Sequence, residues 1–371
     1  MHAPFLLLAA LACGAATAQN FPWERPLLIS GSVDGITFDP PTVFQDSSGV
    51  PSVVRWHGDT LVAAFQWFRQ PNPGPSWDRV AVKFSYDNGA SWTAPTPIVV
   101  NGLPSSYQRP FDPTLAAFGG DSLRIYFSSS DGMPLMLDST VNTYSARSAD
   151  GVHYSFEPGA RVDELNERVI DPAVIQFGPG WHYLAPAGAP QDGAFHYVSP
   201  DGVGWAAVPT IPSDMQHNWT GNYVVENPNE LRFYGAGTNG IWYNSTPNGG
   251  QWNGYTNTNV QGGDPSVVKL GVGSYLMVYV GAPYVTGIAD PHTTASDITV
   301  YPQPASTELT ISWPGHAPVR YRLWSATGTC VALASLQGNS VPLGSIGAGL
   351  YLLEVVDAQG TTRLVRVLKE N

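Results

Sequence analysis

The sequence predicts an all-β protein, a five-bladed β-propeller followed by a separate, small β domain. Two short patterns alternate along the first 280 or so residues and indicate a repeat. The first is a glycine turn followed within a few residues by an aromatic side chain. Its five copies are Ser32–Gly35, Ser85–Gly89, Ser148–Gly151, Ser199–Gly202 and Ser245–Gly249. A unit that returns about every 50 residues, rich in β-forming residues and short turns, is typical of a propeller.

These turns have the composition of tight hairpins. Each places Asp or Asn close before the Gly, and such pairs supply the positive φ angles that a short connection between two strands requires. The full form Ser-x-Asp-x-Gly-x-x-Trp occurs at Ser85–Trp92. It resembles the Asp-box of sialidase-type and related propellers. That resemblance implies a structural hairpin on the outer side of a blade, away from any active site.

The second pattern is an Asp-Pro pair that opens an apolar run. It occurs at Asp39-Pro40, Asp112-Pro113, Asp171-Pro172 and Asp264-Pro265. Proline is tolerated at the first residue of a strand, so these pairs predict innermost strands that begin at one rim of a central channel. The fourth unit lacks the pair and offers strands at Thr220–Val225 and Leu231–Tyr234 instead.

The two patterns are out of step at the ends of the repeat, which predicts how the ring closes. The last Asp-Pro unit ends near Pro283 without a hairpin of its own, whereas the hairpin Leu27–Phe38 precedes every Asp-Pro strand. We therefore expect residues 27–38 to pair with the Ser274–Val280 strand and complete a fifth blade. Closure of this kind removes unpaired sheet edges.

The first 18 residues predict a secretory signal peptide. An apolar core, Pro4–Ala12, is followed by small residues and by Ala16-Thr17-Ala18 before Gln19. A lipoprotein signal ending at Cys13 is the alternative, although Ala10 stands where such a signal prefers a larger aliphatic residue. No other stretch is long and apolar enough to span a bilayer. We expect residues 19–284 to form the propeller.

Residues 285–296 read as a linker, and residues 297–371 carry a compact β pattern. This tail contains Tyr301-Pro302-Gln303-Pro304-Ala305, a Thr-Gly turn, Gly349-Leu350-Tyr351 before a strand, and a basic, hydrophobic end. It resembles the C-terminal sorting domain of the Bacteroidetes type IX secretion system, with Gln303 replacing the usual Asn. The resemblance implies a small β-sandwich that the outer-membrane translocon reads and that is usually cleaved. The protein would then be exported via the periplasm and secreted or held at the cell surface.

The amino-acid composition argues against some classes of binding partner. The formal net charge is −12 and charged residues make up 12% of the chain, which argues against nucleic acid or anionic membranes as partners. Once the signal peptide is removed, Cys330 is the only cysteine. The mature chain therefore has no internal disulfide and no cysteine-based metal site or catalytic pair.

The Asp-Pro pairs are the candidates for chemistry. If the innermost strands start at one mouth, Asp39, Asp112, Asp171 and Asp264 would point toward one another, and clustered carboxyls are what glycoside hydrolysis requires. The pattern looks similar to five-bladed arabinanase-, xylosidase- and invertase-type glycoside hydrolases, which place an Asp at the start of the first blade. The resemblance implies that Asp39 is the base or nucleophile and that Asp112 is the orienting carboxylate. Glu167 would be the acid, with Glu226 as its rival.

Other residues complete the predicted site, and alternatives remain open. Asp171 and Arg109 are expected to contact substrate, and an aromatic sugar platform would come from His217, Trp219 and Trp67, unless the tryptophans only close the blades. The Asp-Pro pairs equally suit plain turn caps. A non-catalytic glycan- or protein-binding propeller is therefore the main alternative, and a Ca²⁺ ion ringed by carboxylates in the channel is compatible with either function.

Overall fold

The computed structural model describes residues 25–69, 77–131, 141–281, 298–325, 330–336, 338–359 and 362–370. The predicted signal peptide and linker lie outside these residues. The chain divides into two compact units, residues 1–284 and 285–371. Among the described residues no helix has the length and hydrophobicity needed to cross a membrane.

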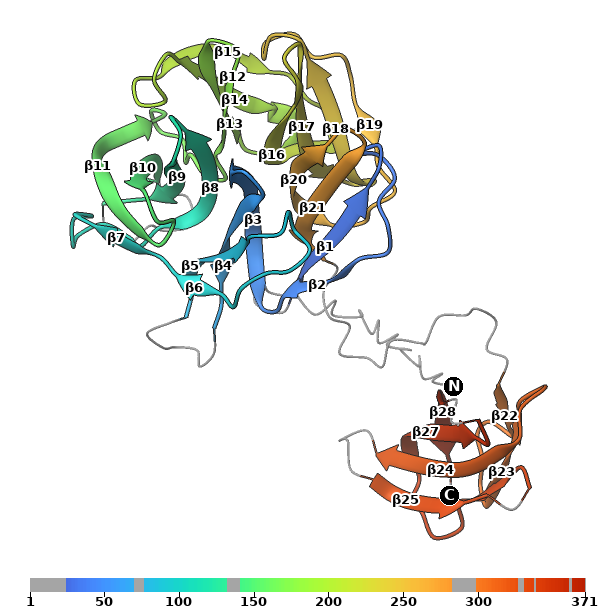
Figure 1. Cartoon of the computed structure of the whole chain (residues 1–371). Coiled ribbons are helices and arrows are strands. Elements are labelled where there is room, and N and C mark those ends of the chain that lie inside the picture. Colours follow the sequence, from blue (N-terminus) through green and yellow to red (C-terminus); the bar gives the residue numbers. More distant parts are fainter. Residues whose placement is uncertain are drawn as a thin grey trace, which may run out of the picture. The chain divides into compact units, whose positions relative to one another are not determined.

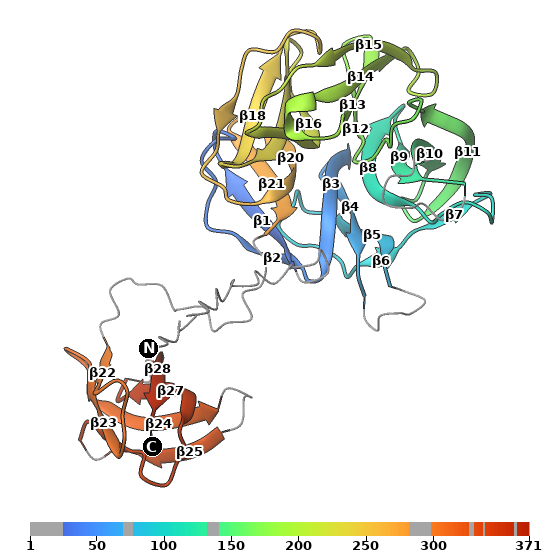
Figure 2. The same ribbon diagram turned by 180° about the vertical axis from the view of Figure 1, so that it is seen from behind.

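The described part of the first unit consists of five antiparallel-rich sheets set around a common centre (Figures 1 and 2). We number these sheets as blades from the chain order of their innermost strands. Blade 1 contains β3 (Ser48–His57), β4 (Thr60–Trp67), β5 (Arg79–Ser85) and β6 (Thr96–Pro97). Blade 2 contains β8 (Phe111–Phe118), β9 (Ser122–Ser129), β10 (Asn142–Ser148), β11 (His153–Val162) and β7 (Val99–Asn101).

The other three blades repeat this arrangement. Blade 3 contains β12 (Ala173–Phe177), β13 (Gly180–Pro186), β14 (Ala194–Ser199) and β15 (Ala206–Ile211). Blade 4 contains β16 (His217–Asn227), β17 (Glu230–Gly237), β18 (Gly240–Thr246) and β19 (Thr256–Asn257). Blade 5 contains β20 (Gly263–Gly271), β21 (Ser274–Val280), β1 (Leu27–Ser32) and β2 (Thr42–Gln45), so it joins the two ends of the unit.

The closure predicted from the sequence is confirmed by the strand register. Strand β1 runs antiparallel to β21, with Leu27 opposite Val280 and Ser32 opposite Tyr275. The same closure shows that one expectation was wrong. The run after Asp39-Pro40 forms β2, the outermost strand of blade 5, and not an innermost strand. The innermost strand of blade 1 is β3, where Val50-Pro51 stands in the place of an Asp-Pro pair.

The glycine turns link neighbouring blades. In the Ser199–Gly202 turn of blade 3, the Asp201 carboxylate accepts hydrogen bonds from two backbone N–H groups, and Tyr126 of blade 2 donates to the Gly202 carbonyl at 2.8 Å. A Cβ on Gly202 would lie only 2.7 Å from the Tyr126 hydroxyl. The pattern recurs around the ring, each turn glycine packing against the preceding blade: Gly35 on Tyr234, Gly89 on Leu276, Gly151 on Phe84 and Gly249 on His182.

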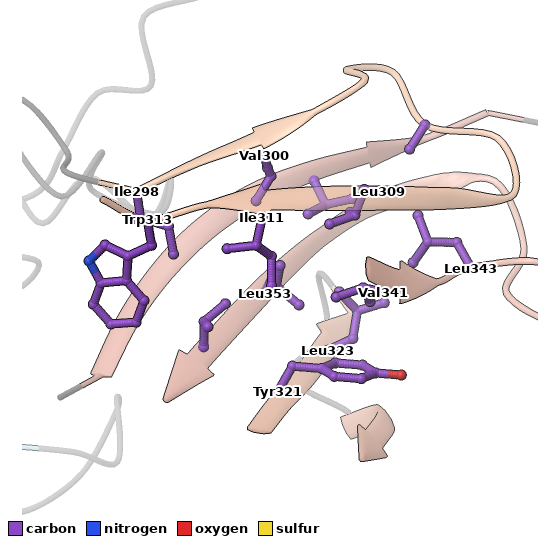
Figure 3. Close-up of a cluster of buried hydrophobic side chains, with 13 residues drawn as sticks. Ile298, Val300, Leu309, Ile311, Trp313, Tyr321, Leu323, Val341, Leu343 and Leu353 are labelled. Carbon is purple, nitrogen blue, oxygen red and sulfur yellow. The ribbon is translucent and has the colours of Figure 1, made fainter. Parts of the chain in front are cut away.

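The second unit is a β-sandwich of two sheets. One sheet has the order β22 (Thr299–Tyr301), β23 (Glu308–Ser312) and β26 (Ser340–Pro342). The other has the order β25 (Cys330–Ser335), β24 (Pro318–Ser325), β27 (Gly349–Asp357) and β28 (Thr362–Lys369). Apolar side chains from both sheets meet in one buried cluster, including Val300, Leu309, Ile311, Leu323 and Leu353 (Figure 3). The small β-sandwich expected for the tail is therefore present.

Candidate functional site

The innermost strands of four blades begin with the same unusual backbone. Asp112, Asp171 and Asp264 each precede a proline and have φ angles of 48°, 53° and 44°. Val50 occupies this place in blade 1 with φ 45°. Positive φ is uncommon outside glycine, and Asp tolerates it better than a β-branched residue does. In blades 1, 2 and 5 the strand ladder also shifts register here, which is the signature of a bulge that redirects side chains.

Each of these aspartates has a raised carboxyl pKa, and charge coupling to other members of the set contributes for two of them. Burial and the charge of Asp264 raise the pKa of Asp112 to about 6, against hydrogen bonds from the Asp171 N–H and Ser128 and the charge of Arg168. Burial and the charges of Asp112 and Asp264 raise the pKa of Asp171. Burial also raises the pKa of Asp264, against the charge of Arg25 and a hydrogen bond with the Thr220 side chain. Carboxyls from blades 2, 3 and 5 therefore share one electrostatic site at the mouth of the ring.

A cavity of about 550 Å³ lies at this mouth between blades 1, 2 and 5. Both Asp112 and Asp264 line it, whereas Asp171 is not among its lining residues. The remaining polar walls come from Arg25, Ser48, Gln66, Asp78, Gln108 and Arg109, and the apolar walls from Val50, Phe68, Phe111 and Val280. The lining mixes hydrogen-bond donors, acceptors and aromatic rings, as in sites for polar small ligands.

Two polar atoms in the cavity wall have no hydrogen-bond partner among the described residues. Gln66 is 4% exposed, and its Nε2 donates to Asp78 while its Oε1 is unpaired. The Nε of Arg25 is also buried and unpaired. An unsatisfied buried polar group costs about 1–3 kcal/mol, so native proteins keep few of them. Both residues line the cavity, so a ligand with one donor and one acceptor would satisfy the two atoms once the side chains turn toward it.

Arg109, predicted as a substrate contact, lines this cavity. Its guanidinium pairs with the Asp78 carboxylate and also donates to the Asp78 carbonyl. Burial lowers the pKa of Arg109. Because Asp78 also accepts from Gln66, these three residues form one hydrogen-bonded wall. The sequence pattern pointed to Arg109 but missed Gln66 and Arg25. Gln66 could have been noticed as an isolated amide in the apolar strand Leu61–Trp67.

The two other residues predicted as catalytic lie elsewhere. Asp39 is exposed between β1 and β2, where its N–H donates to the Gly31 carbonyl at 2.9 Å, because the segment that it opens is the outer edge of blade 5. Glu167 is exposed in a turn before β12 and does not line the cavity. The expectation that Asp39 and Asp112 share one mouth is thus corrected, since Val50 takes the first-blade position.

Glu226, the alternative candidate for the acid, takes part in an ion pair with Lys269. Glu226 accepts from Lys269 at 2.6 Å and from Tyr275 at 2.8 Å. Burial raises the pKa of Glu226, but these hydrogen bonds and the charges of Arg232 and Lys269 outweigh it and lower the pKa overall. A carboxyl held ionised in this way is unsuited to act as a proton donor.

The predicted aromatic platform does not form at the mouth cavity. Trp219 is 1% exposed and packs inside blade 4, with its ring centroid 5.1 Å from that of Trp242. His217 stacks on Tyr255 at 3.8 Å, and Trp67 is absent from the cavity lining. These rings belong to the packing of their blades, the alternative left open by the sequence. Within the described residues no group of three or more His, Cys, Asp or Glu side chains is placed to hold a metal ion.

Comparison with known proteins identifies the tail. Residues 299–368 match the family model described as "Secretion system C-terminal sorting domain". The chain therefore carries a secretion sorting domain, which indicates export followed by secretion or attachment at the cell surface. A search of curated proteins found no match.

Solved structures similar to the chain include three carbohydrate-active enzymes. A GH32 β-fructofuranosidase of Bombyx mori has 11% identity and a TM-score of 0.48, covering 94% of this chain and 90% of its own. An α-L-arabinofuranosidase of Clostridium thermocellum has 14% identity and a TM-score of 0.48, covering 80% and 95%. A Hadza microbial sialidase has 14% identity and a TM-score of 0.45, covering 86% and 65%.

Proposed function

We propose that the protein is an exported glycan-binding propeller whose ligand occupies the mouth cavity. The observation that carries this proposal is the pair of unpaired polar atoms in the cavity wall, Gln66 Oε1 and Arg25 Nε. A sugar hydroxyl both donates and accepts hydrogen bonds, so the hydroxyls of a bound sugar can supply the partner that each atom lacks. Asp112 and Asp264 add acceptors, and Phe68 and Phe111 add apolar surface for a sugar face.

The first blade lacks an Asp at the start of its innermost strand, which favours glycan binding over hydrolysis. Hydrolysis by the common mechanism needs two carboxyls flanking the bond, one acting as acid and the other as base or nucleophile. Val50 stands where the resemblance to glycoside hydrolases implied an Asp, and neither Asp39 nor Glu167 lines the cavity. The tail supports delivery of this binding module to the outside, by the periplasmic route and type IX translocon that its family implies.

A second candidate function is glycoside hydrolysis by Asp112 and Asp264. The observation in its favour is that both carboxyls line one cavity, that both pKa values are raised, and that burial together with the charge of Asp264 raises the pKa of Asp112 to about 6. Such coupling favours a state with one carboxyl protonated and the other ionised, the state that an acid and a base need. A panel of chromogenic glycosides tests it. Turnover that falls about 10²- to 10⁴-fold in Asp112→Asn would support hydrolysis.

The binding proposal is tested by a glycan array with the purified mature chain, followed by calorimetry on the hits. Gln66→Met keeps the side-chain shape but removes the unpaired acceptor, so we expect about 5- to 10-fold weaker binding, the effect of one lost hydrogen bond. Gln251→Met is the matched control, because Gln251 is exposed in a turn of blade 4. An array without ligands, or equal losses in both variants, would contradict the proposal.

A further inference from the structure

The four-stranded sheet of the second unit has one face turned toward the sandwich core and one turned away from it, which we call the outer face. Strand register assigns the residues. Leu323, Leu353 and Val365 lie side by side across β24, β27 and β28 and contact the core cluster. The next row, Trp324, Leu352 and Arg366, therefore points the other way, because side chains alternate along a strand.

The outer face is apolar and exposed. Leu350 and Leu368 are cross-strand partners on β27 and β28 and are 39% and 47% exposed. Leu364 on β28 is 43% exposed, and Leu333 on β25 is 60% exposed. Seven of the fourteen exposed large hydrophobic side chains among the described residues belong to this unit, which has 87 of the 371 residues. Such a concentration on a small domain marks an interaction surface.

Arginines lie among these leucines. Arg322 stands between Leu333 and Glu354 in one cross-strand row, 3.5 Å from the Glu354 carboxylate, and Arg366 lies opposite Leu352. Residues 297–371 carry five Lys and Arg against five Asp and Glu, whereas the whole chain carries 17 against 29. The tail is thus neutral overall in an acidic protein, and on its outer face Arg322 and Arg366 lie beside one carboxylate, Glu354. Its outer face is complementary to an apolar surface that carries carboxylates.

We propose that the outer face is the surface by which the chain docks on the export machinery, and that the partner presents an apolar patch rimmed by carboxylates. The sorting-domain match supplies the occupant, since a sorting domain must be bound by the machinery that exports it. The leucines supply contact area and the arginines supply orientation and selectivity. This inference is independent of what the propeller binds.

The test uses the full chain expressed in a host that has the secretion system. In Leu350→Thr/Leu368→Thr the strand-forming tendency is kept and two leucines of the face are removed. We expect the exported fraction to fall at least tenfold. Val272→Thr is the control, because Val272 is fully exposed in a turn of the propeller, outside the sorting domain, and its export should equal that of the wild type. Arg366→Glu should also reduce export severalfold.

The melting temperature of each purified full chain separates a docking defect from misfolding. If the double variant melts well below the wild type, its loss of export is not informative. The export of Arg366→Glu is then the test, since this substitution removes no buried side chain. Wild-type export of Arg366→Glu and the double variant, or an equal loss in Val272→Thr, would overturn the proposal. Light scattering tests a second copy as occupant: a wild-type dimer that the double variant dissociates would assign the face to self-association and overturn it as well.

Discussion

The carboxyl of Asp112, a half-buried residue, lowers the stability of the fold at neutral pH. Its pKa is raised to about 6 from an ordinary value of 3.8, so the folded protein holds the proton more tightly than the unfolded chain. Stability from this group is therefore present below pH 3.8 and is lost as pH rises to about 6. Each pKa unit corresponds to about 1.4 kcal/mol, so ionisation costs roughly 3 kcal/mol above pH 6.

Asp112→Asn removes this cost because the amide stays neutral. The amide also loses about 1 kcal/mol of hydrogen bonding, since it replaces a carboxylate that accepts from both the Asp171 N–H and Ser128. The net gain at pH 8 is about 1–3 kcal/mol, or roughly 2–10 °C in melting temperature for a unit of this size. At pH 4 the gain should vanish. Asp121→Asn, in an exposed turn of the same blade, is the control and should stay within about 0.5 kcal/mol of the wild type.

The assay is thermal unfolding of both variants and the wild type at pH 4, 6 and 8. A variant Asp112→Asn that is less stable than the wild type at every pH would refute the reasoning. Asp112 would then be an ordinary turn cap whose ionised form stabilises the fold.

Two further predictions concern the links between blades and the buried histidines. Gly202→Ala should lower the melting temperature by about 5–12 °C, because the new methyl group meets the Tyr126 hydroxyl. Gly178→Ala, with φ 60° and open space around it, should cost only about 1 kcal/mol of backbone strain. Equal losses of stability in the two variants would argue against the link between the blades. Burial, and then the charge of His182, lower the pKa of His196 to about 4, so its contribution to stability is lost as pH falls from 6.5 toward 4. His196→Phe should therefore lose less stability than the wild type between pH 7 and 5 in thermal unfolding, and an unchanged pH profile would contradict this assignment.

Most of the fold could be predicted from the repeat pattern, because turns and strand starts are local features. The glycine turns and the closure of the ring, in which residues 27–32 pair with the Ser274–Val280 strand, followed from spacing alone. The site was harder, since Asp39-Pro40 and Asp112-Pro113 look the same in sequence but open different strands of their blades. Only the sheet order shows that Val50 is the true counterpart of Asp112.

The sequence could not predict residues whose proposed role depends on an unpaired atom. Gln66 resembles any polar residue in a strand until the structure shows that Oε1 is buried without a partner and that the residue lines a cavity. The aromatic platform that the sequence predicted does not form at the cavity, for a different reason. Trp219 has the chemistry of a sugar platform, but the same ring is also what fills the interior of blade 4.

The central claim is that the mouth cavity holds a sugar, and a crystal structure of the protein with a glycan selected on the array tests it most directly. We predict a sugar ring between blades 1, 2 and 5, with one hydroxyl donating to Gln66 Oε1 and another accepting from Arg25 Nε. A glycan bound on another surface, with this cavity empty of sugar, would contradict the account.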